Sequence, residues 1–342
     1  MLKNKANVNL TWVLLACITI SAFSGCLSAE NQWALSNTQI NVLMNDYDGS
    51  GITIGIVDTG IDSSHPALSG MKDHIKWKDY INGKSEPYDD NGHGTHVAGI
   101  LAARSSWYDP LFGRPILDGI APSASYIIVK AIDRNGTGSD SNVADAINFC
   151  ANNGADIICL SLGGGTIPIL GTSTENAAAD AAARGIFVVS AAGNDPQASD
   201  VAAPANQQDV IAVGAVNSNC KIADFSQKGD NDGMLPGFQG TTVDQSERED
   251  PNKKPEVVAP GVGITSCWKE GTYAVAQGTS QAVPYVGGAI ALVLQARGSV
   301  SVSAMKTDLM NTAKKCPGQA TPHDDQYGYG LIQAKALLDK LS

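Results

Sequence analysis

The sequence predicts an α/β fold with a mostly parallel central sheet and helices on both faces. Five short apolar runs are rich in β-branched residues and lack polar alternation, as expected of parallel strands that are buried on both sides. Segments with helical periodicity and many small residues fall between and after these runs. This β–α alternation favours a parallel sheet covered by helices, and 342 residues suffice for one large domain.

The expected elements follow one another without an internal repeat. The strands are predicted at residues 52–57, 126–132, 156–162, 186–191 and 210–216. The helices are predicted at residues 95–104, 140–152, 174–184, 280–297 and 302–313. Glycine-rich loops interrupt the pattern at residues 134–138 and 163–165. Residues 228–255 are polar with few apolar residues, and we expect them to be a surface insertion, with residues 105–118 as a second, shorter one.

The first residues are typical of an export signal. Lys3 and Lys5 precede an apolar run over residues 10–23, which is short for a membrane-spanning helix of about 20 residues. Residues 23–26 (Phe-Ser-Gly-Cys) resemble the lipobox of prokaryotic lipoprotein signals, although Leu is usual where Phe23 stands. We therefore expect residues 1–25 to be a signal peptide, with Cys26 as the candidate lipidation site. The alternative is an ordinary cleaved signal with an incidental cysteine.

Charge and cysteine content exclude two classes of function. A net charge of −11 disfavours binding to nucleic acid, which needs basic patches. No CxxC spacing is present, so a zinc site is not expected. Export permits disulfides, and we expect Cys220 to pair with Cys267. The remaining cysteines of the domain, Cys150, Cys159 and Cys316, are expected to be buried free thiols.

Three segments carry the candidate chemistry, and each embeds one reactive side chain among small residues. Asp58 lies in residues 55–62 (Gly-Ile-Val-Asp-Thr-Gly-Ile-Asp), His93 in 91–99 (Asn-Gly-His-Gly-Thr-His-Val-Ala-Gly) and Ser280 in 278–284 (Gly-Thr-Ser-Gln-Ala-Val-Pro). A carboxylate, an imidazole and a hydroxyl are the groups of a serine hydrolase, and the chain order Asp, His, Ser is one of those known for this geometry. Taken singly, Asp58 and Ser280 would be interpreted as capping residues.

A second histidine invites a different interpretation. His96 follows His93 at a spacing of three with no Glu between them, whereas a zinc protease of the HExxH type needs a spacing of four. We therefore reject a zinc-protease site and expect His96 to be structural, hydrogen-bonded inside its helix.

Together the three segments resemble the subtilase family of subtilisin-like serine proteases, and the resemblance extends from Gln32 to about residue 340. It implies a three-layer subtilisin-like fold for residues 26–342. It also implies an oxyanion hole formed by the Asn194 side chain and the Ser280 backbone N–H. The substrate-binding residues that it implies are Gly136, Thr137, Gly138, Ser161, Leu162, Gly163, Ala192 and Gly193.

The resemblance further implies the surroundings of a pocket for the residue before the scissile bond. Residues 202–204 (Ala-Ala-Pro) would line this pocket, with a cis peptide bond before Pro204. Asp195 would lie at its rim and favour basic side chains.

Several positions depart from the family pattern. Gln281 stands where Met usually follows the serine, and Tyr285 stands where His is usual. The usual calcium ligand is replaced by Ala67, so we expect that calcium site to be absent. Residues 230–233 (Asp-Asn-Asp-Gly) resemble only half of an EF-hand loop and leave a different, weak calcium site open. We expect no prodomain, because 31 residues separate Cys26 from Asp58.

The expected function is a serine endopeptidase that cleaves extended or unfolded protein segments through an acyl-enzyme. Two alternatives stay open: a catalytically silent peptide-binding module on the same fold, and a peptide-processing or transpeptidase enzyme. No cofactor is required for the chemistry. We expect an exported monomer in the cell envelope, held at the membrane by a lipid or signal anchor, or alternatively a secreted protein.

Overall fold

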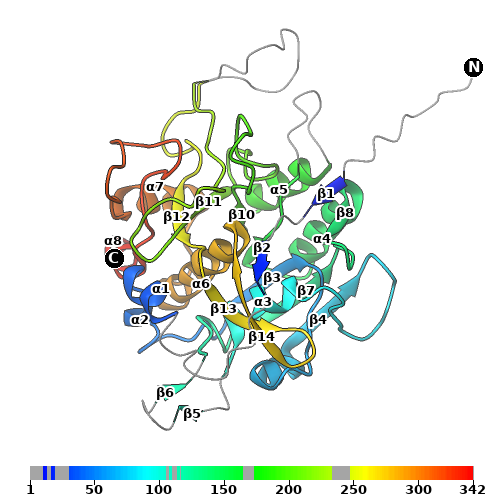
Figure 1. The fold of residues 1–342 in the computed structure, drawn as a ribbon. Coiled ribbons are helices and arrows are strands. Elements are labelled where there is room, and N and C mark those ends of the chain that lie inside the picture. Colours follow the sequence, from blue (N-terminus) through cyan, green and yellow to red (C-terminus); the bar gives the residue numbers. More distant parts are fainter. Residues whose placement is uncertain are drawn as a thin grey trace, which may run out of the picture.

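A seven-stranded parallel sheet forms the centre of the molecule (Figure 1). The computed structural model describes residues 11–13, 17–19, 31–104, 108–109, 114–115, 117–164, 173–232 and 247–341. The strand order is β12-β11-β10-β9-β3-β7-β4, and every neighbouring pair is parallel. In chain order the strands are β3 (Thr53–Asp58), β4 (Ile75–Asp79), β7 (Ser125–Lys130), β9 (Ile157–Leu160), β10 (Phe187–Ala191), β11 (Ile211–Val216) and β12 (Val257–Pro260).

Helices cover both faces of this sheet, which confirms the predicted three-layer α/β fold. Alternate residues of β9 show why both faces need cover: Ile157 and Cys159 belong to one buried cluster, and Ile158 and Leu160 belong to another. The first cluster includes α3 (His93–Ala102) and α6 (Thr279–Arg297), and the second includes α4 (Asp140–Asn152) and α5 (Ser173–Ala183). The remaining helices are α1 (Gln32–Asn37), α2 (Ile40–Leu43), η1 (Pro66–His74), α7 (Val302–Thr312) and α8 (Ala334–Lys340).

The five predicted strands and five predicted helices all exist, and their ends shift by at most two residues. The sequence analysis did not predict β4, β12 or the antiparallel hairpin of β13 (Ile264–Trp268) and β14 (Thr272–Gln277). β4 is an edge strand in which half-buried and exposed positions alternate up to Asp79, so it lacks the continuous apolar run on which the prediction depended.

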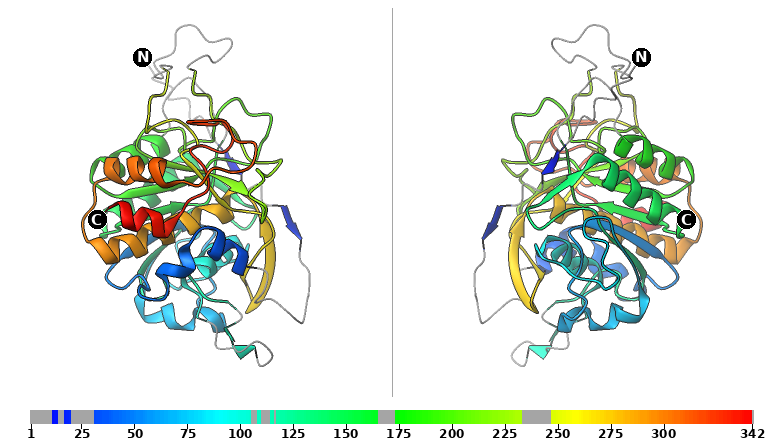
Figure 2. Two further views of the ribbon diagram at one scale, coloured as in Figure 1. Left: turned by 90° about the vertical axis from the view of Figure 1, so that its left-hand side faces the viewer. Right: turned by 90° about the vertical axis from the view of Figure 1, so that its right-hand side faces the viewer.

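Three short strand pairs lie outside the central sheet. β8 (Thr137–Ser139) pairs antiparallel with β1 (Thr11–Val13), and β14 pairs antiparallel with β2 (Cys17–Thr19). Figure 2 shows β2 alongside the β13–β14 hairpin, on the side of the molecule away from α7 and α8. The third pair joins β5 (Tyr108–Asp109) to β6 (Arg114–Pro115). Cys26 and most of the expected signal peptide lie outside the described residues.

The predicted disulfide between Cys220 and Cys267 is wrong. Cys220 is bonded to Cys316, with their Cα atoms 5.5 Å apart. Both belong to a small cluster beside β12, whereas Cys267 is a buried free thiol on β13. Cys150 and Cys159 are buried free thiols, as expected. Burial raises the pKa of the Cys159 and Cys267 thiols to about 12, so both stay protonated.

The inserted stretch 228–255 is anchored by buried polar residues at its two ends. Asn231 donates to the Lys254 carbonyl and accepts from its N–H, and both side chains are buried.

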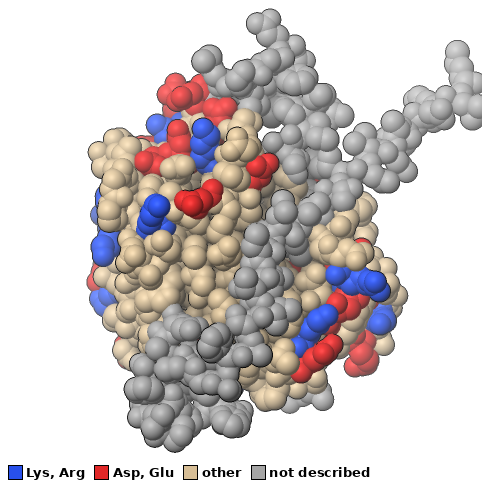
Figure 3. All heavy atoms as spheres, in the orientation of Figure 1, with Lys and Arg blue, Asp and Glu red and all other residues tan. Residues whose placement is uncertain are grey.

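In Figure 3, Asp and Glu side chains gather at the upper end of the molecule. Within the described ranges no single helix is long and apolar enough to cross a membrane; only α6 and α7 taken together pass, with a bend of 112° between them.

Candidate active site

Three candidate residues lie in a row at the carboxyl edge of the sheet, where open α/β sheets bind their ligands. Asp58 is the last residue of β3, Ser161 directly follows β9, and Asn194 follows β10 by three residues. Because β3, β9 and β10 are consecutive neighbours, their ends are separated by about 4.8 Å per strand. Sheet topology therefore brings together residues that are far apart in the sequence.

Asp58 and His93 form a buried pair. The Nδ1 atom of His93 lies 2.8 Å from Oδ1 of Asp58, and the two side chains are only 2% and 0% exposed. The Thr59 N–H donates to the same carboxylate oxygen at 2.7 Å. Gly94 permits this contact: a Cβ at that position would lie 2.2 Å from the Gly60 carbonyl oxygen and 3.2 Å from the Asp58 Cβ. The small residues around His93 are therefore needed for helix α3 to begin this close to β3.

Asp58 also controls the charge of the imidazole. Burial by itself would lower the pKa of His93, but the negative charge of Asp58 and its hydrogen bond outweigh burial and raise it, with a smaller contribution from Asp89. A carboxylate in this position fixes the imidazole tautomer and stabilises the imidazolium when the ring accepts a proton.

Ser280 is the second residue of α6, where backbone N–H groups have no partner within the helix. Its Oγ donates to the Ser161 carbonyl at 2.8 Å, and the Ser161 Oγ donates to the Ser280 carbonyl at 2.8 Å. The Nε2 atom of His93 has no hydrogen-bond partner among the described residues. The structure therefore holds Ser280 over the end of β9, next to the strand of Asp58, with its hydroxyl turned toward Ser161 rather than His93.

Asn194 is attached to the start of the same helix. Its Oδ1 accepts the Thr279 N–H at 2.9 Å and the Thr279 hydroxyl at 3.0 Å. Since the amide oxygen faces Thr279, its Nδ2 points the other way and would lie 3.4 Å from a Cβ placed on Gly278. The Asn194 side-chain amide and the Ser280 backbone N–H therefore both lie close to Gly278.

The segments with the expected substrate-binding residues flank β3. Gly136, Thr137 and Gly138 follow β7, on one side of β3, and residues 161–163 follow β9, on the other side. Trp12 lies opposite Gly138 in the β1–β8 pair, and Ile18 lies opposite Ala276 in the β2–β14 pair. Both β8 and β14 thus offer an edge that accepts an antiparallel strand.

The residues expected around a substrate pocket also converge. The Ala202 N–H donates to the Ala192 carbonyl at 2.7 Å. The Ala202 methyl group lies 2.9 Å and 3.0 Å from the positions that Cβ atoms on Gly163 and Gly193 would occupy. The Ala203–Pro204 peptide bond is cis, as expected. Asp195 is exposed at the start of the following loop.

His96 is structural, but its partner is not in its own helix. Its Nε2 lies 3.1 Å from the Ile264 carbonyl oxygen of β13, and the side chain is fully buried. Burial, aided by the charge of His93, lowers the pKa of His96 to about 3, so the ring is neutral. The prediction of a bond within the helix is wrong because the ring points across to the hairpin.

The sequence analysis missed Asp89, which organises the start of α3. Its carboxylate accepts the N–H groups of Gly92 and Thr95 at 2.8 and 2.9 Å and the Thr59 hydroxyl at 2.9 Å. It therefore links the chain after Asp58 to the helix of His93. No capping signal marks it, because the N-cap of α3 is Gly92 and Asp89 lies three residues before it.

Two departures from the family pattern have structural consequences. Gln281 is fully buried, and neither of its amide atoms has a hydrogen-bond partner among the described residues. Ala67 is buried on η1, and its methyl group offers no oxygen to a cation, so the residues do not fit the family's usual calcium site. In the part of the chain that the structure describes, no cluster of three or more His, Cys, Asp or Glu residues could hold a metal ion.

Comparison with known proteins agrees with this geometry. A model of the subtilase family matches residues 49–330. A thermophilic serine proteinase from Bacillus sp. (strain AK1) is 37% identical over 305 residues, which are 89% of this chain and 66% of that protein. Subtilisin DY from Bacillus licheniformis is 35% identical over 85% of this chain and 92% of its own length. Subtilisin Savinase from Lederbergia lenta is 35% identical over 89% of this chain and 97% of its own length. Because the family model matches most of this chain, the chain belongs to the subtilase family.

Proposed function

We propose that this subtilase is a serine endopeptidase in which Ser280 is the nucleophile, His93 the general base and Asp58 the residue that orients His93. The buried Asp58–His93 pair, at the carboxyl edge of the sheet beside the start of α6, carries this proposal. A carboxylate and an imidazole withdrawn from water in this way must compensate each other and are costly to keep for stability alone. They fit a site in which the imidazole must accept and return a proton.

The reaction begins when the Ser280 side chain turns from the Ser161 carbonyl toward His93. Nε2 of His93 accepts the hydroxyl proton while Oγ attacks the peptide carbonyl carbon, giving a tetrahedral oxyanion. His93 then protonates the leaving amine, the C–N bond breaks, and the acyl-enzyme remains. A water molecule repeats the sequence: it gives one proton to His93, attacks the ester carbonyl and releases the acid and the free Ser280 hydroxyl. No step calls for a cofactor.

The oxyanion is stabilised from two sides. The Ser280 backbone N–H lies in the first turn of α6, where the helix dipole favours negative charge. The Asn194 amide, oriented by Thr279, supplies the second donor. Both donors are held before the reaction, so their reorganisation costs little in the transition state.

The substrate binds as an extended segment. Thr11–Val13 and Cys17–Thr19 of this chain already pair antiparallel with β8 and β14, and only three residues separate them. A substrate strand can pair with β8 in the same way and lie between two edges, with Gly136–Gly138 on one side and Ser161, Leu162 and Gly163 on the other. Ala192 and Gly193 would border the pocket for the residue before the cut. A folded protein cannot present its backbone to both edges, which favours extended or unfolded segments.

The proposed location is the cell envelope, with the enzyme exported as a monomer and anchored through a lipid on Cys26. The support is the order of Lys3, Lys5, an apolar run and a cysteine in the sequence. Incorporation of radiolabelled lipid that is lost in Cys26→Ser would support the anchor. A secreted protein that carries no labelled lipid would contradict the anchor and indicate an ordinary cleaved signal.

Labelling with a fluorophosphonate probe tests the catalytic proposal. The wild-type chain should be labelled at Ser280, and Ser280→Ala should not be labelled although it folds. A folded wild-type protein that resists labelling would contradict the proposal. Mass spectrometry of the products from a model peptide then separates hydrolysis from transfer to an added amine.

A further inference from the structure

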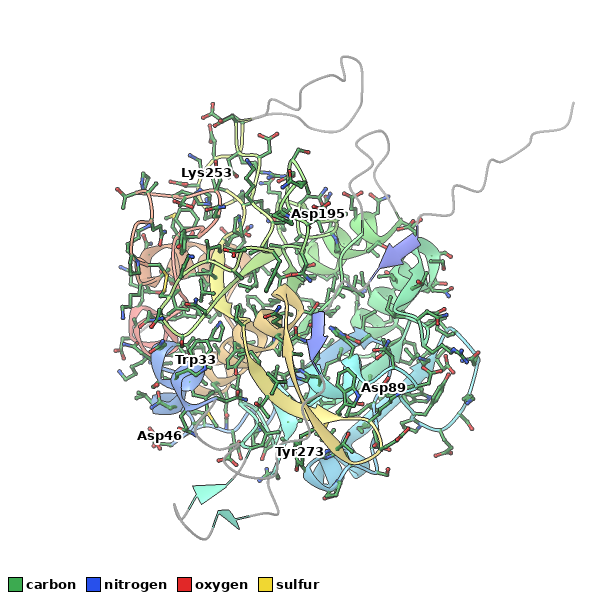
Figure 4. The ribbon with its side chains drawn as sticks, viewed as in Figure 1. Trp33, Asp46, Asp89, Asp195, Lys253 and Tyr273 are labelled. Carbon is green, nitrogen blue, oxygen red and sulfur yellow. A yellow bond between two sulfur atoms is a disulfide. The ribbon has the colours of Figure 1, made fainter. Side chains whose placement is uncertain are left out.

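The loop over residues 195–200 leads from Asn194 to the pocket residue Ala202, and among the described residues its outer side borders a cleft rather than packed side chains. A cleft of about 380 Å³ separates residues 196–199 from residues 228–232. Residues Asp195, Pro196, Gln197 and Ser199 are exposed. The position of this loop must therefore depend on contacts at its base. Figure 4 places Asp195, at the start of the loop, and Lys253, in the inserted stretch 228–255, at the same upper end of the molecule.

Gln227 makes the first of these contacts and bonds both ends of the loop. Its Oε1 accepts the Asp195 N–H at 3.2 Å, and its Nε2 donates to the Asp200 carbonyl at 2.9 Å. Its own N–H donates to the Gly193 carbonyl at 3.0 Å. A Cβ on Gly193 would lie 1.8 Å from Oε1 of Gln227, so only glycine admits this side chain beneath the loop.

Arg248, from the inserted stretch, makes the second contact. Its two terminal nitrogens donate to the two oxygens of Asp200 at 2.8 and 2.7 Å, although the residues are 48 positions apart. The guanidinium also donates to the carbonyls of Asp230 and Asn206 at 2.9 and 3.3 Å. The side chains of Arg248 and Asp200 are only 20% and 13% exposed. A bidentate, largely buried pair of this kind fixes orientation as well as distance.

We propose that Arg248 is a positioning residue that sets the substrate selectivity of this enzyme by holding the 195–200 loop through Asp200, together with Gln227. The proposal rests on the proposed endopeptidase function. It assigns a role to the inserted stretch: the insertion fixes the loop that leads into Ala202, the residue whose methyl group lies between Gly163 and Gly193.

The reactive groups have an attachment of their own, so the effect should fall on selectivity. Asn194 is held by Thr279 at the start of α6, and the Asp58–His93 pair lies two strands away from β10. In a well-formed apolar pocket, a single methylene of the substrate changes kcat/KM about 10- to 200-fold. A pocket whose wall moves loses much of this discrimination and binds each peptide more weakly.

A set of peptides that differ only in the residue before the scissile bond tests the proposal. In Arg248→Ala and in Asp200→Asn, the ratio of kcat/KM between the best and the poorest peptide should fall at least about fivefold, with most of the loss in KM. Labelling by a small fluorophosphonate, which has no side chain for the pocket, should slow far less. Glu249→Ala is the matched control, because Glu249 is exposed on the same turn.

Arg248→Lys adds a conservative variant that keeps the charge but loses the bidentate contact, and its selectivity should lie between wild type and Arg248→Ala. If Arg248→Ala does not fold, Arg248→Lys and Asp200→Asn decide the question. An unchanged selectivity ratio in folded variants would overturn the proposal. An equal loss of kcat/KM for all peptides and of the labelling rate for the probe would also overturn it, because general destabilisation produces that result. A wild-type protein without any activity would instead contradict the endopeptidase function.

Discussion

Replacing Asp58 by Asn tests the proposed mechanism most directly. The change preserves the shape of the side chain but removes its charge and lets an amide group face Nδ1 of His93. In the native structure these groups are 2.8 Å apart and almost fully buried. At an effective dielectric constant of about 20, unit charges at that separation attract by about 6 kcal/mol. This attraction exists only once His93 has accepted the Ser280 proton, so it lowers the barrier of the chemical step.

A barrier higher by about 5.5 kcal/mol corresponds to a rate about 10⁴-fold lower. We therefore expect kcat of Asp58→Asn to fall about 10⁴-fold at pH 8, with KM little changed. The pH profile should change as well. Asp58 raises the pKa of His93 against the effect of burial. Without that charge burial dominates, the pKa falls, and the acidic limb of kcat/KM moves to lower pH.

Hydrolysis of a chromogenic peptide, followed across pH 5–9 and normalised by active-site titration, measures both effects. Ser280→Ala gives the background from contaminating proteases. Asp62→Asn is the matched control, because Asp62 accepts from Ser64 and Gly271 rather than from His93. A loss in kcat below about tenfold, or an acidic limb that does not move, would refute the assigned role of Asp58.

Three further changes have defined expectations. Asn194→Ala should lower kcat about 10²- to 10³-fold in steady-state peptide hydrolysis with KM nearly unchanged, because its amide acts on the transition state; a change confined to KM would contradict this. Cys220→Ser opens a disulfide that spans 96 residues and should cost up to about 4–5 kcal/mol of unfolding free energy in urea titrations, with equal loss in Cys316→Ser. Glu256→Gln leaves two buried lysines without their shared carboxylate and should cost about 3–5 kcal/mol in the same assay.

The fold class and the reactive residues could be predicted because their signals are local. A buried strand such as β9 needs a continuous apolar run, and the start of α3 against β3 needs Gly94 beside His93. The edge strand β4 escaped notice because one side of it meets solvent and its sequence alternates. The same limit applies to Asp89, whose contacts depend on how the chain after β3 meets helix α3.

The contacts that could not be predicted from the sequence join segments that only the fold brings together. Cys220 could be paired with several cysteines, and the choice of Cys316 depends on the path of the chain after α7. The ring of His96 faces β13 for a similar reason, since the hairpin packs across its helix. No pattern of spacing encodes such partners, because each one is chosen by tertiary packing rather than by the residues beside it.

The same difference between local and long-range contacts distinguishes the proposed catalytic residues from the residues that we propose to set substrate selectivity. Asp58 ends β3, His93 begins α3 and Ser280 lies in the first turn of α6, so changing their surroundings would disturb the core. The 195–200 loop instead borders a cleft and is held by Gln227 and by Arg248 from an insertion. Changes in the insertion can therefore alter which peptides are cleaved while the reactive groups keep their geometry. Selectivity should therefore respond to substitution of Arg248, whose contacts with Asp200 leave the Asp58–His93 pair untouched, and not to substitution of its exposed neighbour Glu249.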